Sequence, residues 1–334
     1  MNPPATEFVF VLTNPGSEKP LKNEMSALRP DWRPAYQRRG FVTFKAGAAV
    51  SFAALDAPAA CARRLCLSLG KMATRDEAVR LIDEALGFCP KSIVHHARYH
   101  DRKMQGVSGG GIMKLPELGQ FIGTVVELRS NEFWAGLHRH LPHLSPDPAG
   151  DAGCVMPPES PSRAWLKLEE AIRFFGLKFS ASDIVVELGC APGGVALALL
   201  ERGISVIGVD PADMAAVVRS STIEDRGEAT DGRPWFWHCR KPAALVSKRD
   251  LGHGVTWFMS DMNQTPEVVL AECARFCRMA PTIRSVLITL KLTDLGQVAE
   301  KAQWLDKLSA MGFTTARLQQ FSVHHKEFAL LAFK

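Results

Sequence analysis

The chain has 334 residues, a hydrophobic content of 46% and a formal net charge of +5. At about 150 residues per domain, this length predicts two domains, and the hydrophobic content excludes a largely disordered chain. No run approaches the roughly 20 apolar residues that span a membrane, and the first residues show no secretory signal, so we expect a cytoplasmic protein with no membrane partner.

The eight cysteines lie at positions 61, 66, 89, 154, 190, 239, 273 and 277, and no two of them form a Cys-x-x-Cys pair. A zinc site is therefore not expected, and no residue is assigned as a metal ligand. Cys273 and Cys277 have helical i, i+4 spacing, which indicates two small core residues rather than a metal pair. In a reducing compartment we expect free thiols.

Residues 1–144 predict a small α+β domain. Its expected elements are strands at 7–13, 40–45 and 120–129 and an amphipathic helix at 75–86. Residues 1–104 contain 16 lysines and arginines against 10 acidic residues. This surplus favours a domain that faces a polyanion, although the net charge of the whole chain favours nucleic acid only weakly.

Residues 95–103 combine three histidines with basic side chains and are followed by Gly109 to Gly111. The composition predicts a loop. Such a loop would be either a mobile basic segment that contacts phosphates or a solvated surface loop, and the sequence favours both equally.

Residues 145–159 are polar and rich in proline, which is typical of a linker. After a helix that begins at Ser160-Pro161, strands alternate with helices through residues 160–334. The expected strands are 183–188, 204–209, 255–260 and 284–290, and the helices between and after them are 192–202, 266–279 and 297–311. Two final strands, 314–319 and 327–333, should form an antiparallel edge. This alternation predicts an α/β, Rossmann-like domain with a mostly parallel sheet.

The segment 185–194 (VVELGCAPGG) joins a predicted strand to a predicted helix through glycines. Its G-x-x-x-G-G spacing differs from the G-x-G-x-x-G of dinucleotide enzymes. The next strand ends in Asp210, 23 residues after Glu187, where a carboxylate can bind ribose hydroxyls. Together these features favour S-adenosylmethionine over NAD, whereas an ordinary strand-to-helix turn is the alternative for the glycines alone.

Polar side chains occupy four positions where an apolar or neutral residue is expected: Lys167, Asp261, Lys291 and Glu327. The first lies in the helix after the linker, and the other three lie at strand ends. Because ligand sites of open α/β sheets lie at the carboxyl ends of parallel strands, we expect these groups to meet Glu187 and Asp210 there. The simpler alternative is two surface ion pairs of little energetic value.

Residues 160–334 closely resemble the RlmM-type 23S rRNA (cytidine) 2'-O-ribose methyltransferases, which are related to the FtsJ/RrmJ family. The matching motifs are PSRAWLKLEEA from Pro161, the segment 185–194, Val209-Asp210, residues 257–266 with Asp261-Met262, Leu290-Lys291-Leu292 and His325-Lys326-Glu327. The resemblance implies S-adenosylmethionine as cofactor and 23S rRNA, or a large-subunit precursor, as substrate. It also implies a ferredoxin-like, THUMP-related RNA-binding domain before residue 160.

The resemblance further implies a Lys-Asp-Lys-Glu tetrad at Lys167, Asp261, Lys291 and Glu327, with Lys291 as proton acceptor. A ribose hydroxyl is a very weak acid, so methyl transfer needs a base near the oxygen and in-line alignment. The expected cofactor contacts are Ser162, Glu187, Gly189, Ala191, Pro192, Gly193, Gly194, Asp210 and Asp261. Residues 235–241 are basic where the resemblance implies another acidic contact, so that contact has no assigned residue.

Other methyltransferase classes lack their signatures here. The amino-methylating enzymes carry Asn/Asp-Pro-Pro-aromatic where residues 260–263 read Ser-Asp-Met-Asn, and the C5-pyrimidine enzymes need a nucleophilic cysteine, usually after proline. Two alternatives stay open: a small-molecule O-methyltransferase, and an RNA-binding or ribosome-assembly factor with a catalytically silent fold. The sequence does not set the oligomeric state, and we favour a monomer.

Overall fold

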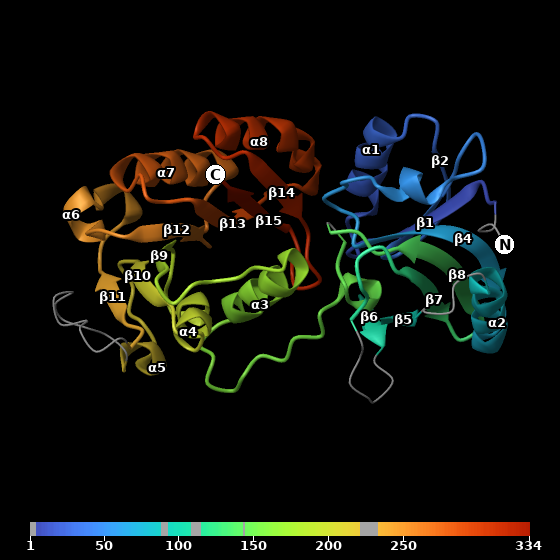
Figure 1. Cartoon of the computed structure of the whole chain (residues 1–334), viewed down its shortest axis with the longest axis horizontal. Helices are drawn as coiled ribbons and strands as arrows, with labels where there is room; N and C mark the ends of the chain where they lie inside the picture. The colour runs from blue at the N-terminus through green and yellow to red at the C-terminus, as the bar shows by residue number, and fades with distance from the viewer. Residues whose placement is uncertain (1–4, 88–92, 108–114, 143, 221–232) are drawn as a thin grey trace. The chain divides into compact units, whose positions relative to one another are not determined.

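The computed structural model describes residues 5–87, 93–107, 115–142, 144–220 and 233–334. The chain divides into two compact units, each with its own sheet (Figure 1). The first unit contains Met1–Gly153, Arg173–Gly176 and Gln319–His325, and the second contains Cys154–Ile172, Leu177–Leu318 and Lys326–Lys334. Two short pieces from the C-terminal half therefore belong to the first unit.

The second unit contains a seven-stranded sheet with the order β11-β10-β9-β12-β13-β15-β14. Its strands are β9 (Ile184–Leu188), β10 (Ser205–Val209), β11 (Phe236–Cys239), β12 (Val255–Ser260), β13 (Ser285–Lys291), β14 (Thr315–Gln319) and β15 (Glu327–Phe333). The five strands from β11 to β13 pair in parallel, and β15 pairs with β13 in the antiparallel direction. The predicted α/β fold with a mostly parallel sheet is confirmed.

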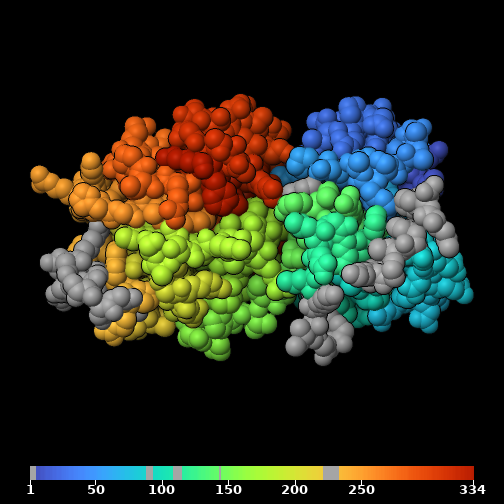
Figure 2. Space-filling model, in the orientation of Figure 1, coloured from blue at the N-terminus to red at the C-terminus, as the bar shows by residue number. Residues whose placement is uncertain are grey.

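Helices cover both faces of this sheet, with α3 and α4 on one face and α7 and α8 on the other (Figure 1). The helical segments of the unit are α3 (Ala164–Phe175), α4 (Gly194–Leu200), α5 (Ala216–Arg219), η4 (Ala243–Leu245), α6 (Lys248–Leu251), α7 (Pro266–Met279), η5 (Leu295–Glu300) and α8 (Lys301–Ala310). Because both faces are covered, the strands are nearly continuous apolar runs. On the face visible in Figure 2, the yellow-green and the orange-to-red parts of this unit pack directly against each other.

α7 illustrates how the sequence sets a helix in this unit. Pro266 occupies the first turn, where its missing N–H costs nothing. The buried stripe that follows includes Val269, Cys273 and Phe276, at the spacing of one helix face. Cys273 and Cys277 are both buried, so the prediction that they are core residues is confirmed. Cys66, Cys190, Cys273 and Cys277 are free thiols.

The first unit contains an eight-stranded sheet with the order β2-β3-β1-β4-β8-β7-β5-β6. Its elements are β1 (Phe8–Leu12), α1 (Glu18–Leu28), β2 (Arg33–Arg38), β3 (Phe41–Lys45), η1 (Phe52–Leu55), β4 (Arg64–Met72), α2 (Arg75–Leu86), β5 (Ile93–His100), β6 (Lys103–Val107), β7 (Phe121–Arg129), β8 (Glu132–Arg139) and η2 (Pro148–Gly150). All its pairs are antiparallel except β5 with β7. A mixed sheet with two helices fits the predicted α+β class, and its THUMP-related character stays a prediction.

The prediction of a loop at residues 95–103 was wrong, because these residues lie in a β-hairpin formed by β5 and β6. Along β5 the buried positions His95 and Ala97 alternate with the more exposed His96 and Arg98. The strand thus has the period of two that a half-buried strand needs, with histidine and alanine in place of larger apolar residues. Gly109 to Gly111 lie outside the described residues.

Buried polar groups line part of this sheet. The fully buried Arg64 donates to the backbone oxygens of Ser145 and Asp147 and lies 2.8 Å from Nε2 of His138. Burial, reinforced by Arg64, lowers the pKa of His95 to about 3, so this histidine is neutral at physiological pH. Within the part of the chain that the structure describes, no helix is both long enough and apolar enough to cross a membrane.

Candidate functional site

The turn between β9 and α4 is shaped by its glycines. Gly193 has a φ of 110°, a left-handed conformation that favours glycine. A Cβ atom on Gly194 would lie 2.3 Å from Oγ of Ser162 and 2.9 Å from the backbone nitrogen of Trp165. The missing side chain at Gly194 therefore lets the predicted residue Ser162 pack against the start of α4.

Asp210 follows β10 and closes the same turn. Its Oδ2 accepts a hydrogen bond from the backbone N–H of Ala191 at 3.1 Å, and its Oδ1 accepts from Ala212 at 2.9 Å. Each carboxylate oxygen keeps a further lone pair, which suits the two hydroxyls of a ribose. Nε2 of His238, on the neighbouring β11, lies 3.0 Å from the backbone oxygen of Asp210.

Glu187 is a buried carboxyl group at the end of β9, only 2% exposed. Among the residues that the structure describes, its Oε2 has no hydrogen-bond partner. Burial, with Asp261 and Asp210 nearby, raises the pKa of Glu187 well above its usual range. A buried acceptor without a donor fits a bound molecule that brings a donor or a positive charge, and S-adenosylmethionine carries both. The glycine turn, Asp210 and Glu187 are thus compatible with this cofactor.

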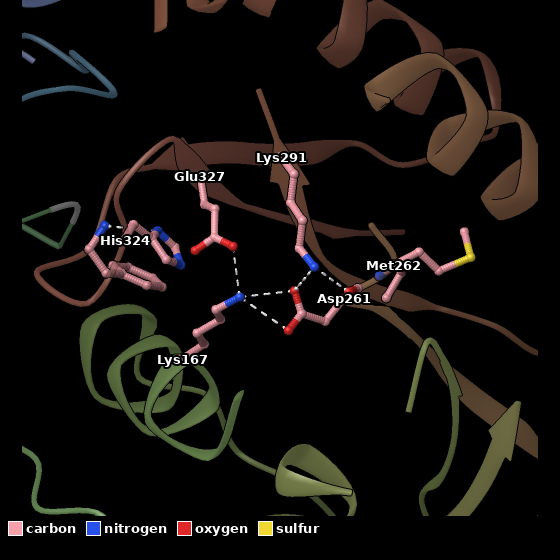
Figure 3. Close-up of polar contacts among 8 residues, drawn as sticks. Lys167, Asp261, Met262, Lys291, His324 and Glu327 are labelled. Atoms are coloured by element: carbon pink, nitrogen blue, oxygen red, sulfur yellow. Dashed lines mark hydrogen bonds and ion pairs between the residues drawn. The ribbon is translucent and has the colours of Figure 1, made fainter. Parts of the chain in front are cut away.

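The four polar residues singled out in the sequence lie together (Figure 3). Nζ of Lys167 donates to Oδ1 and Oδ2 of Asp261 at 3.0 and 3.1 Å and to Oε1 of Glu327 at 2.9 Å. Nζ of Lys291 donates to the backbone oxygen of Asp261 at 2.7 Å and lies 3.2 Å from its Oδ1. The four side chains are 15 to 23% exposed, so the cluster is partly buried yet open to a substrate.

Sheet register explains why these residues meet. Lys291, the last residue of β13, pairs directly with Glu327, the first residue of the antiparallel β15. Asp261 follows the parallel strand β12, and its backbone N–H donates to the oxygen of Leu188 at 3.0 Å. Lys167 reaches the group from α3 (Figure 3). The tetrad therefore sits where parallel strands end, the usual ligand side of an open α/β sheet.

The cofactor-type turn and the tetrad adjoin each other. A Cβ atom on Gly189 would lie 3.0 Å from both the backbone nitrogen and the Cα of Met262, the residue after Asp261. The predicted residues from Ser162 to Asp261 thus belong to one region of the second unit. Met262 lies in the matched motif and His238 in the basic segment 235–241, but the sequence assigned neither a place at the site, because only the strand order brings them to this edge.

Comparisons with known proteins point to methyltransferases. Residues 161–326 match the family described as FtsJ-like methyltransferase. The chain is 29% identical, over 73% of its length, to Ribosomal RNA large subunit methyltransferase M of Aggregatibacter aphrophilus, and 28% identical, over 63%, to the protein of the same name from Laribacter hongkongensis. These alignments cover 65% and 57% of the two relatives, so the chain spans less than two thirds of either.

Proposed function

Because residues 161–326 match the FtsJ-like methyltransferase family, we propose that the chain transfers a methyl group to a ribose 2'-hydroxyl of ribosomal RNA. S-adenosylmethionine is the methyl donor. The substrate we propose is 23S rRNA, or a large-subunit precursor, with a cytidine as the target nucleotide. Both relatives are named as methyltransferases of large-subunit ribosomal RNA, which supports this choice.

One observation carries the proposed chemistry: the two lysines use their N–H groups differently. Lys167 has three acceptors within 3.1 Å, two on Asp261 and one on Glu327, which matches the three donors of an ammonium. Among the described residues, Lys291 donates one hydrogen bond, to the backbone oxygen of Asp261, and forms a 3.2 Å ion pair with Oδ1 of the same residue. Its Nζ is therefore less fully engaged than that of Lys167 and can meet a substrate hydroxyl.

This difference assigns the roles. Lys291 is the proposed base: its Nζ accepts the proton of the 2'-hydroxyl as the oxygen bonds to the methyl carbon. When bound, S-adenosylmethionine supplies that carbon on a sulfonium sulfur, which leaves as a neutral thioether. Lys167 lies between two carboxylates, with Asp261 holding both lysines in place and Glu327 holding Lys167. Alignment of oxygen and methyl group is where most of the acceleration would arise.

The cofactor-holding residues are proposed from the turn. The backbone of Ala191 to Gly194, with Pro192 and Gly193 between them, forms the cradle, and Ser162 and Gly189 border it. The carboxylate of Asp210 would bind the ribose hydroxyls of the cofactor, and the buried Glu187 carboxyl would accept a donor or favour a positive charge on it. Asp261 contributes to both the cofactor and the tetrad.

The test is transfer of labelled methyl from S-adenosylmethionine to protein-free 23S rRNA that lacks the modification. A 2'-O-methyl group protects the adjacent phosphodiester from alkali, so the modified position is mapped by alkaline hydrolysis. The expected result is incorporation at one alkali-resistant cytidine. Incorporation that alkali fails to protect would indicate base methylation, and cofactor binding without incorporation would favour a silent, RNA-binding fold.

A further inference from the structure

Two of the four tetrad residues lie on elements whose ends are held within the first unit. Lys167 lies on α3, and the end of that helix, Arg173–Gly176, belongs to the first unit. Glu327 begins β15, and the loop that leads into it, Gln319–His325, belongs to the first unit as well. In Figure 3, His324 lies on this loop, which runs into Glu327. Residues that fix these two pieces therefore act on the tetrad through the backbone.

Asn14 holds the loop. Its Nδ2 donates to the backbone oxygens of Phe321 and His324 at 2.7 and 2.8 Å, and its side chain is buried. Its Oδ1 accepts a hydrogen bond from Nη1 of Arg63 at 3.2 Å, which fixes the orientation of the amide. Close by, Ser17 donates to Oε1 of Gln320 at 2.8 Å. One buried amide thus fastens the loop at two points.

Asp147 holds the end of α3. Nε of Arg173 donates to both carboxylate oxygens of Asp147 at 2.7 Å, and the Asp147 side chain is only 1% exposed. The backbone oxygen of Asp147 in turn accepts from the buried Arg64 at 2.5 Å. This charged pair is buried on the Asp147 side, so its geometry is tightly defined.

An aromatic cluster joins the two pieces. The ring of Phe321, in the loop, lies 5.4 Å from that of Phe174 and 5.5 Å from that of Phe175, both at the end of α3. These separations are typical of packed aromatic pairs. The end of the helix and the loop therefore pack together, with Asn14 bonded to the loop and Asp147 bonded to the helix end.

The distances along the chain are short. Lys167 lies six residues before Arg173, about 9 Å along an α-helix. Glu327 lies two residues after His325, and the oxygen of the intervening Lys326 accepts from the backbone N–H of Leu292 at 2.8 Å. We propose that Asn14 and Asp147 are positioning residues that keep Lys167 and Glu327 at their 2.9 Å contact; this role rests on the proposed methyl transfer.

The test uses the full chain with Asn14→Asp, which keeps the acceptor toward Arg63 and removes both donors to the loop. The expected result is a fall in kcat of about 10- to 100-fold, as small misplacements of reacting groups produce. The Kd values for S-adenosylmethionine and for rRNA should stay within about twofold of the wild type.

Asp147→Asn weakens the hold on α3 at constant volume. It should likewise lower kcat and leave both Kd values unchanged. The matched control is Arg202→Gln, which removes the 2.6 Å ion pair between Arg202 and Glu169 of α3 and should leave kcat within about twofold.

A double-mutant cycle separates positioning from general destabilisation. If Asn14 acts through Glu327, Asn14→Asp should lower kcat by less than about twofold in a Glu327→Ala background. An equal fold-loss in both backgrounds would overturn the positioning role, as would an unchanged kcat in Asn14→Asp and Asp147→Asn when the wild-type chain is active. A wild-type chain that transfers no methyl to RNA would instead overturn the proposed function, and the positioning role with it.

Discussion

Glu187 is the residue whose chemistry depends most on what fills the site. In the folded chain one of its oxygens has no hydrogen-bond partner, and burial with two nearby carboxylates raises its pKa well above the usual range. A group of this kind keeps its proton where an ordinary carboxylic acid has lost it. The carboxyl therefore makes folding less favourable as pH rises, unless a bound donor or cation compensates.

This gives a pH prediction for the protein without cofactor. The folded-state pKa of Glu187 lies above the unfolded value of about 4.3. The stability contributed by the protonated form is complete below the unfolded pKa and is lost as pH rises through the folded one. Relative to Glu187→Gln, the wild-type free energy of unfolding should therefore fall between pH 5 and pH 8. Urea denaturation at both pH values measures it, and parallel pH profiles for the two proteins would refute it.

At the scale of the elements, the turn between β9 and α4 depends on the absence of a side chain at Gly194. A methyl group there would lie 2.3 Å from Oγ of Ser162, with backbone atoms of Ser162 and Trp165 at 2.9 Å behind it. Only a shift of residues 162–165, at the start of α3, could accommodate this methyl group. Because α3 carries Lys167, such a shift would also reach the tetrad.

Gly194→Ala should lower the free energy of unfolding by about 1–3 kcal/mol, the usual cost of overpacking, and weaken S-adenosylmethionine binding at least tenfold. The control is Gly47→Ala, because a Cβ at Gly47 meets nothing within 4 Å; its effect on stability should stay within about 0.5 kcal/mol. Denaturation and isothermal titration measure the two quantities. Cofactor affinity that matches the wild type in Gly194→Ala would show that this turn does not form the cradle.

The elements of the second unit were largely predictable from sequence. In the first unit β1, β3, α2 and β7 were predicted close to their observed bounds, whereas other strands, such as β4 and β5, were not. Strands buried on both faces read as apolar runs, so β12 and β15 were predicted with the bounds that the structure has. β4 and β5 instead place Arg64, Ser68 and His95 at buried positions. Polar residues inside a sheet hide the alternation on which sequence prediction depends, because their partners lie on other strands.

At the scale of the whole molecule, charge would govern how the chain binds the RNA that we propose as its substrate. The net charge of +5 is modest, and the surplus of basic residues lies in the first 104 positions. Binding to rRNA through phosphate contacts releases counterions, so affinity should fall steeply with salt. We expect the Kd for 23S rRNA to rise at least tenfold between 50 and 200 mM KCl, measured by filter binding. A Kd that salt leaves unchanged would mean that shape or base contacts, rather than phosphates, dominate.

The positioning contacts mark the limit of what the sequence could predict at this scale. The candidate tetrad was recognisable, because each of its members interrupts an apolar pattern at a strand end or on a helix. Asn14 and Phe321 are 307 residues apart and neither is unusual in its local sequence. Contacts of this range follow only from the fold.

The most direct test of the proposed mechanism compares Lys291→Ala with the wild type in single-turnover methyl transfer to 23S rRNA at saturating S-adenosylmethionine. Loss of a general base should lower the rate by about 10²–10⁴-fold. The Kd for S-adenosylmethionine should stay within about twofold, because the side-chain contacts described for Lys291 are with Asp261. Lys291→Ala protein that forms the alkali-resistant product at the wild-type rate would contradict the assignment of Lys291 as the base.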